Sequence, residues 1–177
     1  MRDANEPRFT KLMLDLGNRI AAMNFVYDQI LLSKDLNHIN TSRYVFSLIR
    51  NIQTSYGENN GRIKLSADTG DISLDVETSI HCGLIINEMV SNSFKHAFTP
   101  EQKGVINVVL RHGAENGNLE LIVKDNGVGI KEEIDFSKVK SLGMRLVTTL
   151  AENQLNGKIE VNRNNGTEFK VVFPMDK

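Results

Sequence analysis

The segment at residues 85–97 constrains the fold of this chain more than any other part of its sequence. Glu88, Asn92, Lys95 and His96 are spaced so that they share one face of a helix. The rest of that helix is mostly apolar, with Ile85, Ile86, Met89, Val90, Phe94 and Ala97. Burying a carboxylate and an amide is costly unless something satisfies them. By itself, the pattern fits equally a core helix whose polar face meets a ligand and an ordinary amphipathic helix whose polar face meets solvent.

The remaining pattern predicts a helical first part followed by interleaved strands and helices. Apolar residues at helical spacing predict a long helix over residues 9–31, and a polar break at 33–40 separates it from a second helix. That second helix begins near Thr41 or Ser42, either of which can cap it, and stops near Gly57. Strands are expected at residues 62–67, 72–76, 105–111, 119–124, 158–162 and 167–173, and further helices at 79–98 and about 143–156. This order predicts an α+β two-layer sandwich, with helices on one face of a mixed sheet.

Composition excludes several classes of protein. The chain of 177 residues is 40% hydrophobic and 24% charged, which is enough apolar content for a sizeable core. A net charge of -1 gives no electrostatic case for nucleic acid or an anionic membrane as the main partner. With Cys82 as the only cysteine, no intrachain disulfide is possible. No apolar run approaches the roughly 20 residues that span a bilayer, and residues 1–9 lack a signal-peptide stretch. We therefore expect a cytoplasmic location.

Three further motifs carry candidate chemistry. Asp125 follows a predicted strand, where its carboxylate can accept a hydrogen bond from the exocyclic amine of adenine but would repel the carbonyl of guanine. Gly127 and Gly129 let the backbone turn sharply and approach a base closely, although Asp-Asn-Gly is also a common turn sequence. Gly143 precedes a helix whose first turn can seat phosphate with help from Arg145; plain capping by Ser141 is the alternative.

The fourth motif is Gly166-Thr167 at the start of the last strand, where the Thr167 hydroxyl can bond the adenine side of a pocket. Together, in this order, the motifs resemble the Bergerat-type ATP-binding domain of the GHKL superfamily, which is shared by histidine kinases, gyrase B-type topoisomerases, Hsp90 and MutL. Residues 87–97 resemble the N box, 125–129 the G1 box and 142–144 the G2 box. Within that group, residues 82–98, 154–157 and 166–169 are similar to sensor histidine kinases of the second HisKA-type class.

The resemblance extends upstream. Residues 18–23 and 33–39 are similar to the second helix of that class's dimerisation and phosphoacceptor hairpin and to its exit. It therefore implies two parts: residues 1–36 as a partial hairpin helix and residues 37–177 as the catalytic domain. The family's F box is absent, and residues 131–140 are left as a short ATP lid.

The resemblance also implies a reaction and its participants. ATP and Mg²⁺ are the expected cofactors, with Asn92 as metal ligand and with Asp125, Gly127, Gly129, Gly143, Met144, Arg145 and Thr167 at the nucleotide. Glu88, Lys95 and His96 are the expected catalytic residues, and Glu88 would orient the incoming imidazole or a Mg²⁺-bound water. The γ-phosphoryl group would pass to a histidine, and none of His38, His81, His96 and His112 lies in a helix that matches the acceptor segment.

The acceptor is therefore expected outside this chain, on the hairpin of the parent kinase. A response regulator is expected downstream, and a homodimer through the N-terminal helix is possible. Two rival hypotheses remain: a protein serine kinase of the anti-sigma-factor type, and a nucleotide-sensing module without transfer activity. The helix before the core argues against the first, and the intact motifs argue against the second.

Overall fold

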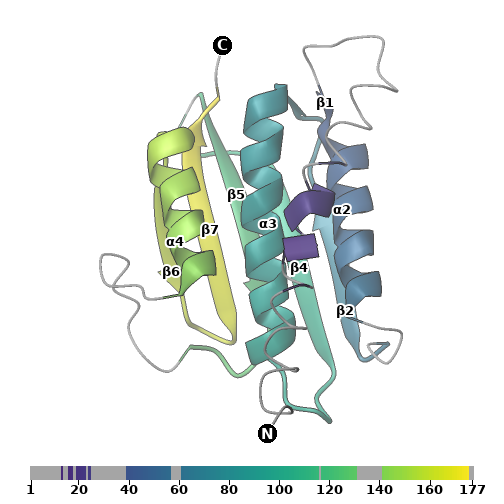
Figure 1. Ribbon diagram of the computed structural model, residues 1–177. Helices are drawn as coiled ribbons and strands as arrows, with labels where there is room; N and C mark the ends of the chain where they lie inside the picture. Colours follow the sequence, from purple (N-terminus) through teal and green to yellow (C-terminus); the bar gives the residue numbers. More distant parts are fainter. Residues whose placement is uncertain are drawn as a thin grey trace, which may run out of the picture.

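A five-stranded sheet forms one layer of the molecule, and helices cover one of its faces (Figure 1). The computed structural model describes residues 13, 16, 17, 19–22, 24, 39–56, 61–115, 117–130 and 141–175. The helices are α2 (Thr41–Ser55), α3 (Val76–His96), α4 (Leu142–Thr149) and a π-helical turn (Leu150–Gln154). The main strands are β2 (Ile63–Asp68), β4 (Gly104–His112), β5 (Asn118–Asp125), β6 (Lys158–Asn162) and β7 (Thr167–Pro174). The predicted two-layer sandwich is confirmed.

The sheet is mixed because one connection crosses over it. The strand order is β2-β4-β5-β7-β6, in which β2 and β4 are parallel and every other pair is antiparallel. A parallel pair needs a crossover connection, and α3 supplies it between β2 and β4. This crossover holds α3 against the middle of the sheet, where it contacts β4 and β5.

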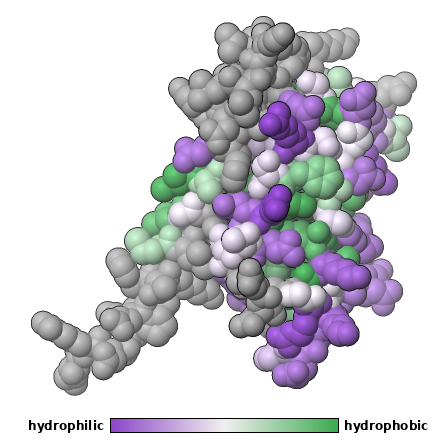
Figure 2. All heavy atoms as spheres, turned by 90° about the vertical axis from the view of Figure 1, so that its right-hand side faces the viewer, coloured by the Kyte–Doolittle hydropathy of each residue, from purple (hydrophilic) through white to green (hydrophobic). Residues whose placement is uncertain are grey.

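The core lies between the sheet and the helices. Leu119, Leu121 and Val123 of β5 are buried, as their alternation predicts. On α2, the apolar side chains spaced along one helix face are buried too: Tyr44, Val45, Leu48, Ile49 and Ile52. The outer side of α2 carries hydrophilic and apolar residues intermixed (Figure 2), and Phe46 is its exposed aromatic side chain.

The cap of α2 differs from the prediction. Neither Thr41 nor Ser42 caps the helix: the side-chain oxygen of Asn40 accepts the N–H of Arg43 at 2.9 Å. Thr41 instead lies inside the first turn and is buried. Asn stabilises a helix N-terminus about as well as Ser does. The cap therefore lies one residue before the predicted Thr41 and makes the same kind of hydrogen bond.

The strand expected at residues 72–76 is much shorter than predicted. Only Ser73–Leu74 (β3) is extended, and it pairs with β1 (Ile39–Asn40) in a separate two-stranded sheet rather than with β2. The reason is Asp75, whose carboxylate accepts the N–H of Thr78 at 2.9 Å and caps α3. The helix therefore begins at Val76, three residues before the predicted start.

The predicted helix over residues 143–156 changes type midway. After α4, the N–H of Leu155 bonds to the carbonyl of Leu150 at 2.9 Å, which is an i to i+5 bond that closes a π turn. Both leucines are buried. The helical segment ends where Asn156 adopts a left-handed φ of 50° and the chain enters β6.

The described residues between 13 and 24 are all helical, in agreement with the helix predicted over residues 9–31. Residues 9–12 and 25–31 of that predicted helix, and residues 33–38 of the predicted polar break, lie outside the described part. Ala22 is buried, and Met13, Leu16 and Ile20 are exposed on another side of the helix. Among the described helices, none has the length and apolar character needed to cross a bilayer.

Candidate functional site

A buried carboxylate, that of Asp125, lies at the end of β5. One of its oxygens, Oδ1, accepts the N–H of Gly127 at 3.0 Å and the N–H of Thr167 at 3.2 Å. The other, Oδ2, accepts the hydroxyl of Ser93 at 2.8 Å. The donors come from the loop after β5, from the start of β7 and from α3, and Asp125 is only 3% exposed. Three separate segments thus fix the position of this carboxylate, and hydrogen bonds to its charged form compensate its burial.

Glycines let the chain close around Asp125. A Cβ at position 127 would collide with the carbonyl oxygen of Ala97, the residue that ends α3. The adjacent N–H of Val128 donates to that same carbonyl at 2.8 Å. On the other side, Gly166 has a φ of 109°, and a Cβ there would collide with the carbonyl of Asp125. Close backbone approach and a positive φ therefore require glycine at these two positions.

A cavity of about 320 Å³ opens beside this carboxylate. It is lined by Asn92, Ser93, His96, Ala97, Asp125, Gly129, Ile130, Ser141, Met144, Thr167 and Phe169. Its walls combine apolar side chains with a few polar groups, and its size falls within the range of small-molecule sites. The cavity lies between the C-terminal end of α3, the strand ends of β5 and β7, and the start of α4.

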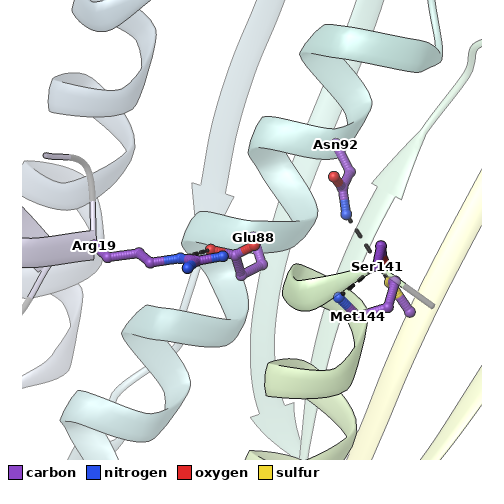
Figure 3. A network of polar contacts seen from close by, with 5 residues as sticks. All are labelled: Arg19, Glu88, Asn92, Ser141 and Met144. Atoms are coloured by element: carbon purple, nitrogen blue, oxygen red, sulfur yellow. Dashed lines mark hydrogen bonds and ion pairs between the residues drawn. The ribbon is translucent and has the colours of Figure 1, made fainter. Parts of the chain in front are cut away.

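Asn92 and the first turn of α4 form one wall of the cavity. The side-chain nitrogen of Asn92 contacts the sulfur of Met144 at 3.9 Å, and the N–H of Met144 donates to the Ser141 hydroxyl at 3.3 Å (Figure 3). Ser141 thereby caps α4, as the alternative interpretation of that motif proposed. Because its nitrogen faces Met144, the Asn92 amide keeps its carbonyl oxygen available as an acceptor.

Glu88 lies one helical turn before Asn92 and has a different partner. Its Oε1 pairs with Nε of Arg19 at 2.6 Å, and the two side chains point toward one another in Figure 3. The Glu88 side chain is 10% exposed and the Arg19 side chain is 17% exposed. A Cβ at position 143 would collide with Oε2 of Glu88, so the glycine at the start of α4 makes room for this carboxylate.

The predicted site residues therefore fall into two groups. Six of them line the cavity: Asn92, His96, Asp125, Gly129, Met144 and Thr167. Five are not part of its lining: Glu88, Lys95, Gly127, Gly143 and Arg145. Among these, Gly127 still contacts Asp125 through its N–H, Lys95 is half-buried and Arg145 is exposed. Thr167 contacts Asp125 through its backbone N–H, whereas a role for its hydroxyl at a base stays a prediction.

Ser93 is the main residue that sequence reasoning missed. Its hydroxyl bonds Asp125 across 32 residues of chain. Two signals could have pointed to it: a serine in the middle of an apolar helix, and its position directly after Asn92. Ile130 and Phe169, which supply apolar lining, were also missed, because an apolar residue in a sheet or loop does not distinguish a pocket wall from a core.

This arrangement matches a known family. The profile of the "Histidine kinase-, DNA gyrase B-, and HSP90-like ATPase" family covers residues 77–177, and a second profile, described as "Histidine kinase", covers residues 1–56. The chain therefore belongs to the histidine kinase-, gyrase B- and Hsp90-like ATPases, as the motifs predicted. The expected boundary at residues 36 and 37 stays a prediction.

Similar proteins narrow the comparison to histidine kinases. Blue-light-activated histidine kinase 2 of Erythrobacter litoralis is 26% identical over 92% of this chain and 47% of its own length. Sensor histidine kinase PdtaS of Mycobacterium tuberculosis is 25% identical over 93% of this chain and 33% of its own length. Among solved structures, the histidine kinase domain of the Erythrobacter litoralis EL346 blue-light activated kinase superposes with a TM-score of 0.78 at 26% identity. That superposition covers 91% of this chain and 75% of the solved one. The chain spans at most about half the length of these two curated relatives.

Proposed function

We propose that this chain is the ATP-binding catalytic part of a two-component sensor histidine kinase, which transfers the γ-phosphoryl group of ATP to a histidine outside these 177 residues. The observation that carries the proposal is the buried Asp125 carboxylate, held by three donors at the edge of a cavity of about 320 Å³. Both histidine kinase matches, to residues 1–56 and to residues 77–177, support it.

The cavity beside Asp125 fits adenine. A carboxylate offers only acceptors, which suits the exocyclic amine of adenine and opposes the carbonyl of guanine. Its three donors prevent it from turning away, so the preference is built into the folded chain. Ile130, Met144 and Phe169 supply apolar surface for the faces of the ring.

The donor set also fits Mg²⁺ that arrives with the nucleotide. Within the described residues, no group of three or more His, Cys, Asp or Glu side chains could hold a metal by itself. Mg²⁺ in nucleotide sites is commonly held by one or two protein oxygens together with phosphates and waters. Asn92 offers one such oxygen in the cavity wall, because its nitrogen is turned to Met144.

The remaining residues suit a phosphate tail and its acceptor. ATP would supply the phosphoryl group, and Mg²⁺ would neutralise its charge. His96 lines the cavity, and Lys95 of α3 and Arg145 of α4 directly adjoin the lining residues His96 and Met144 in the sequence. Positive charge at this end of the cavity would stabilise phosphate oxygens. Glu88 is the carboxylate we assign to orienting the incoming imidazole. Residues 131–140, which the sequence predicts as the lid, lie outside the described residues.

The acceptor and partners follow from the same assignment. Three described histidines lie on α3 or at the end of β4: His81, His96 and His112. We assign the acceptor to the hairpin of the parent kinase, the next transfer to a response regulator, and dimerisation to the N-terminal helix. The cytoplasm is the compartment in which these steps would occur. The histidine kinase match to residues 1–56 favours this function over the serine kinase alternative.

Base selectivity and phosphoryl transfer test the proposal. Titration calorimetry should show Mg²⁺-ATP binding and no comparable GTP binding. Asp125→Asn should weaken ATP binding by about 10- to 150-fold, the equivalent of one hydrogen bond to a charged group. Asp68→Asn, at an exposed carboxylate, is the matched control. Equal affinity for ATP and GTP would overturn the adenine assignment.

The transfer arm uses labelled ATP and a separately prepared histidine-bearing hairpin of the parent kinase. Acid-labile label should appear on the hairpin and not on the 177-residue chain. Asn92→Ala should remove the Mg²⁺ dependence of nucleotide binding. Acid-stable label on the acceptor would favour the serine kinase alternative, and ATP binding with no transfer to any acceptor would favour the sensing module.

A further inference from the structure

Polar contacts join the described N-terminal helical residues to the catalytic part. Arg19 pairs with Glu88 of α3 at 2.6 Å, and the carbonyl of Ala22 accepts the hydroxyl of Tyr44 of α2 at 3.2 Å. Arg19 and Ala22 are three residues apart and therefore lie on neighbouring parts of one helix face. Space for the second contact depends on Gly83, where a Cβ would collide with the Tyr44 hydroxyl. The helix is thus seated at a defined position over α2 and α3.

This seating encloses both oxygens of Glu88. Oε1 is bonded to Arg19, and Oε2 lies against the backbone of Gly143, where a Cβ would not fit. Glu88 as a whole is 7% exposed. A carboxylate that orients a nucleophile must come within about 2.6–3.2 Å of its N–H. While Arg19 holds Oε1 at 2.6 Å, an incoming imidazole N–H has to compete with its guanidinium for this carboxylate.

We propose that the Arg19–Glu88 ion pair is an autoinhibitory clasp: the docked N-terminal helix withholds Glu88 from the acceptor histidine, and phosphoryl transfer requires Arg19 to withdraw. This inference rests on the proposed function, since it regulates the same site. It concerns Glu88 alone, because Arg19 is not part of the cavity lining and nucleotide binding does not require its release.

The exchange of partners is physically balanced. A buried carboxylate left without a partner is strongly unfavourable, so Arg19 leaves Glu88 only when another donor replaces it. The N–H of an incoming imidazole replaces the Arg19 donor, so Glu88 is satisfied before and after the exchange. The clasp therefore opens when an acceptor is presented and stays closed otherwise, which restrains transfer in the absence of a correctly placed histidine.

The test compares variants of the full 177-residue chain. Arg19→Met keeps the length of the side chain and removes its charge, Arg19→Lys keeps the charge, and Arg50→Met, on the exposed side of α2, is the matched control. Single-turnover transfer to the hairpin should rise about 5- to 150-fold in Arg19→Met, the usual span of couplings between sites. It should stay near the wild-type rate in Arg19→Lys and Arg50→Met, and ATP affinity should not change. Equal or slower transfer by Arg19→Met with ATP affinity retained would overturn the clasp.

Amide hydrogen exchange separates failure of the clasp from failure of the proposed function. Backbone amides of residues 19–22 should exchange faster in Arg19→Met and in Glu88→Gln, and the double variant should add little to either, because both changes remove the same contact. If every variant binds ATP but none transfers a phosphoryl group to the hairpin, the proposed function fails. The amide exchange rates of residues 19–22 then decide by themselves whether the Arg19–Glu88 contact holds the helix in place. Unchanged exchange in Arg19→Met would then refute the clasp.

Discussion

Ser93→Ala gives a direct measure of what holds the candidate adenine-binding carboxylate in place. The Ser93 hydroxyl donates to Oδ2 of Asp125 at 2.8 Å, and it is the only donor to that oxygen within the described residues. Removing it leaves one oxygen of a 3%-exposed carboxylate without its bond. Hydrogen bonds to charged groups contribute about 1.5–3 kcal/mol. For a chain of this size, that corresponds to a fall in Tm of roughly 3–12 °C.

Ser91→Ala is the control for this measurement. Ser91 lies on the same helix two residues earlier and is 5% exposed, against 7% for Ser93. Both substitutions remove a buried hydroxyl and gain the same helix propensity, so those effects cancel in the difference. No hydrogen bond of the Ser91 hydroxyl is seen in the described part of the chain.

The assay is urea unfolding followed by circular dichroism, with ATP titration as a second measurement. Ser93→Ala should be less stable than Ser91→Ala by about 1.5–3 kcal/mol and should bind ATP more weakly, because the carboxylate is no longer fixed. A difference in unfolding free energy below about 0.5 kcal/mol, the range of neutral surface substitutions, would refute the reasoning.

Three further predictions concern the fold around the site. Asp75→Ala should lower the free energy of unfolding by about 0.5–2 kcal/mol because it removes the α3 cap, and Asp71→Ala, at an exposed carboxylate, is the control. Burial acts to raise the pKa of Asp75, but hydrogen bonds from Thr78 and neighbouring backbone lower it below 3.8 overall. The stabilisation should therefore be complete above pH 3.8 and disappear as pH falls through the lowered value, and unchanged pH dependence in the variant would contradict this. Gly127→Ala should destabilise the chain by about 1–3 kcal/mol through its collision with Ala97, whereas Gly61→Ala, which meets open space, should not; equal effects in denaturant titration would contradict the packing argument. Burial raises the pKa of the Cys82 thiol to about 12, so a thiol reagent at pH 8 should label it only in denaturant, and rapid labelling of the native chain would contradict its burial.

The sequence predicted the elements that local patterns determine. The alternation of Leu119, Leu121 and Val123 identified the buried face of β5, and the polar face around Asn92 identified the helix at the cavity. The strands expected at residues 158–162 and 167–173 leave a short connection between them, in which Asn165 and Gly166 adopt positive φ. These signals are short-range, because residues that share a turn or a face constrain one another directly.

Contacts between distant segments were not predictable in this way. Arg19 and Glu88 are 69 residues apart, and Asp125 and Thr167 are 42 apart, so no spacing rule connects them. The parallel pairing of β2 with β4 likewise depends on how α3 crosses the sheet, and the antiparallel pairing of β3 with β1 forms a separate sheet that no local pattern indicates. The wrong prediction of a strand over residues 72–76 has a local cause. The Asp75 side chain caps α3, and this interaction outweighs the strand pattern of these residues.

The π turn after α4 has a consequence for changes in chain length. It contains one residue more per hydrogen-bonded turn than an α-helix does, and it holds Leu150 and Leu155, five positions apart, in the same core. Deleting one exposed residue between them, such as Glu152, would bring the two leucines to a spacing of four, which an uninterrupted α-helix also places on one face. We therefore expect a single-residue deletion at this position to leave the fold intact, with both leucines still buried.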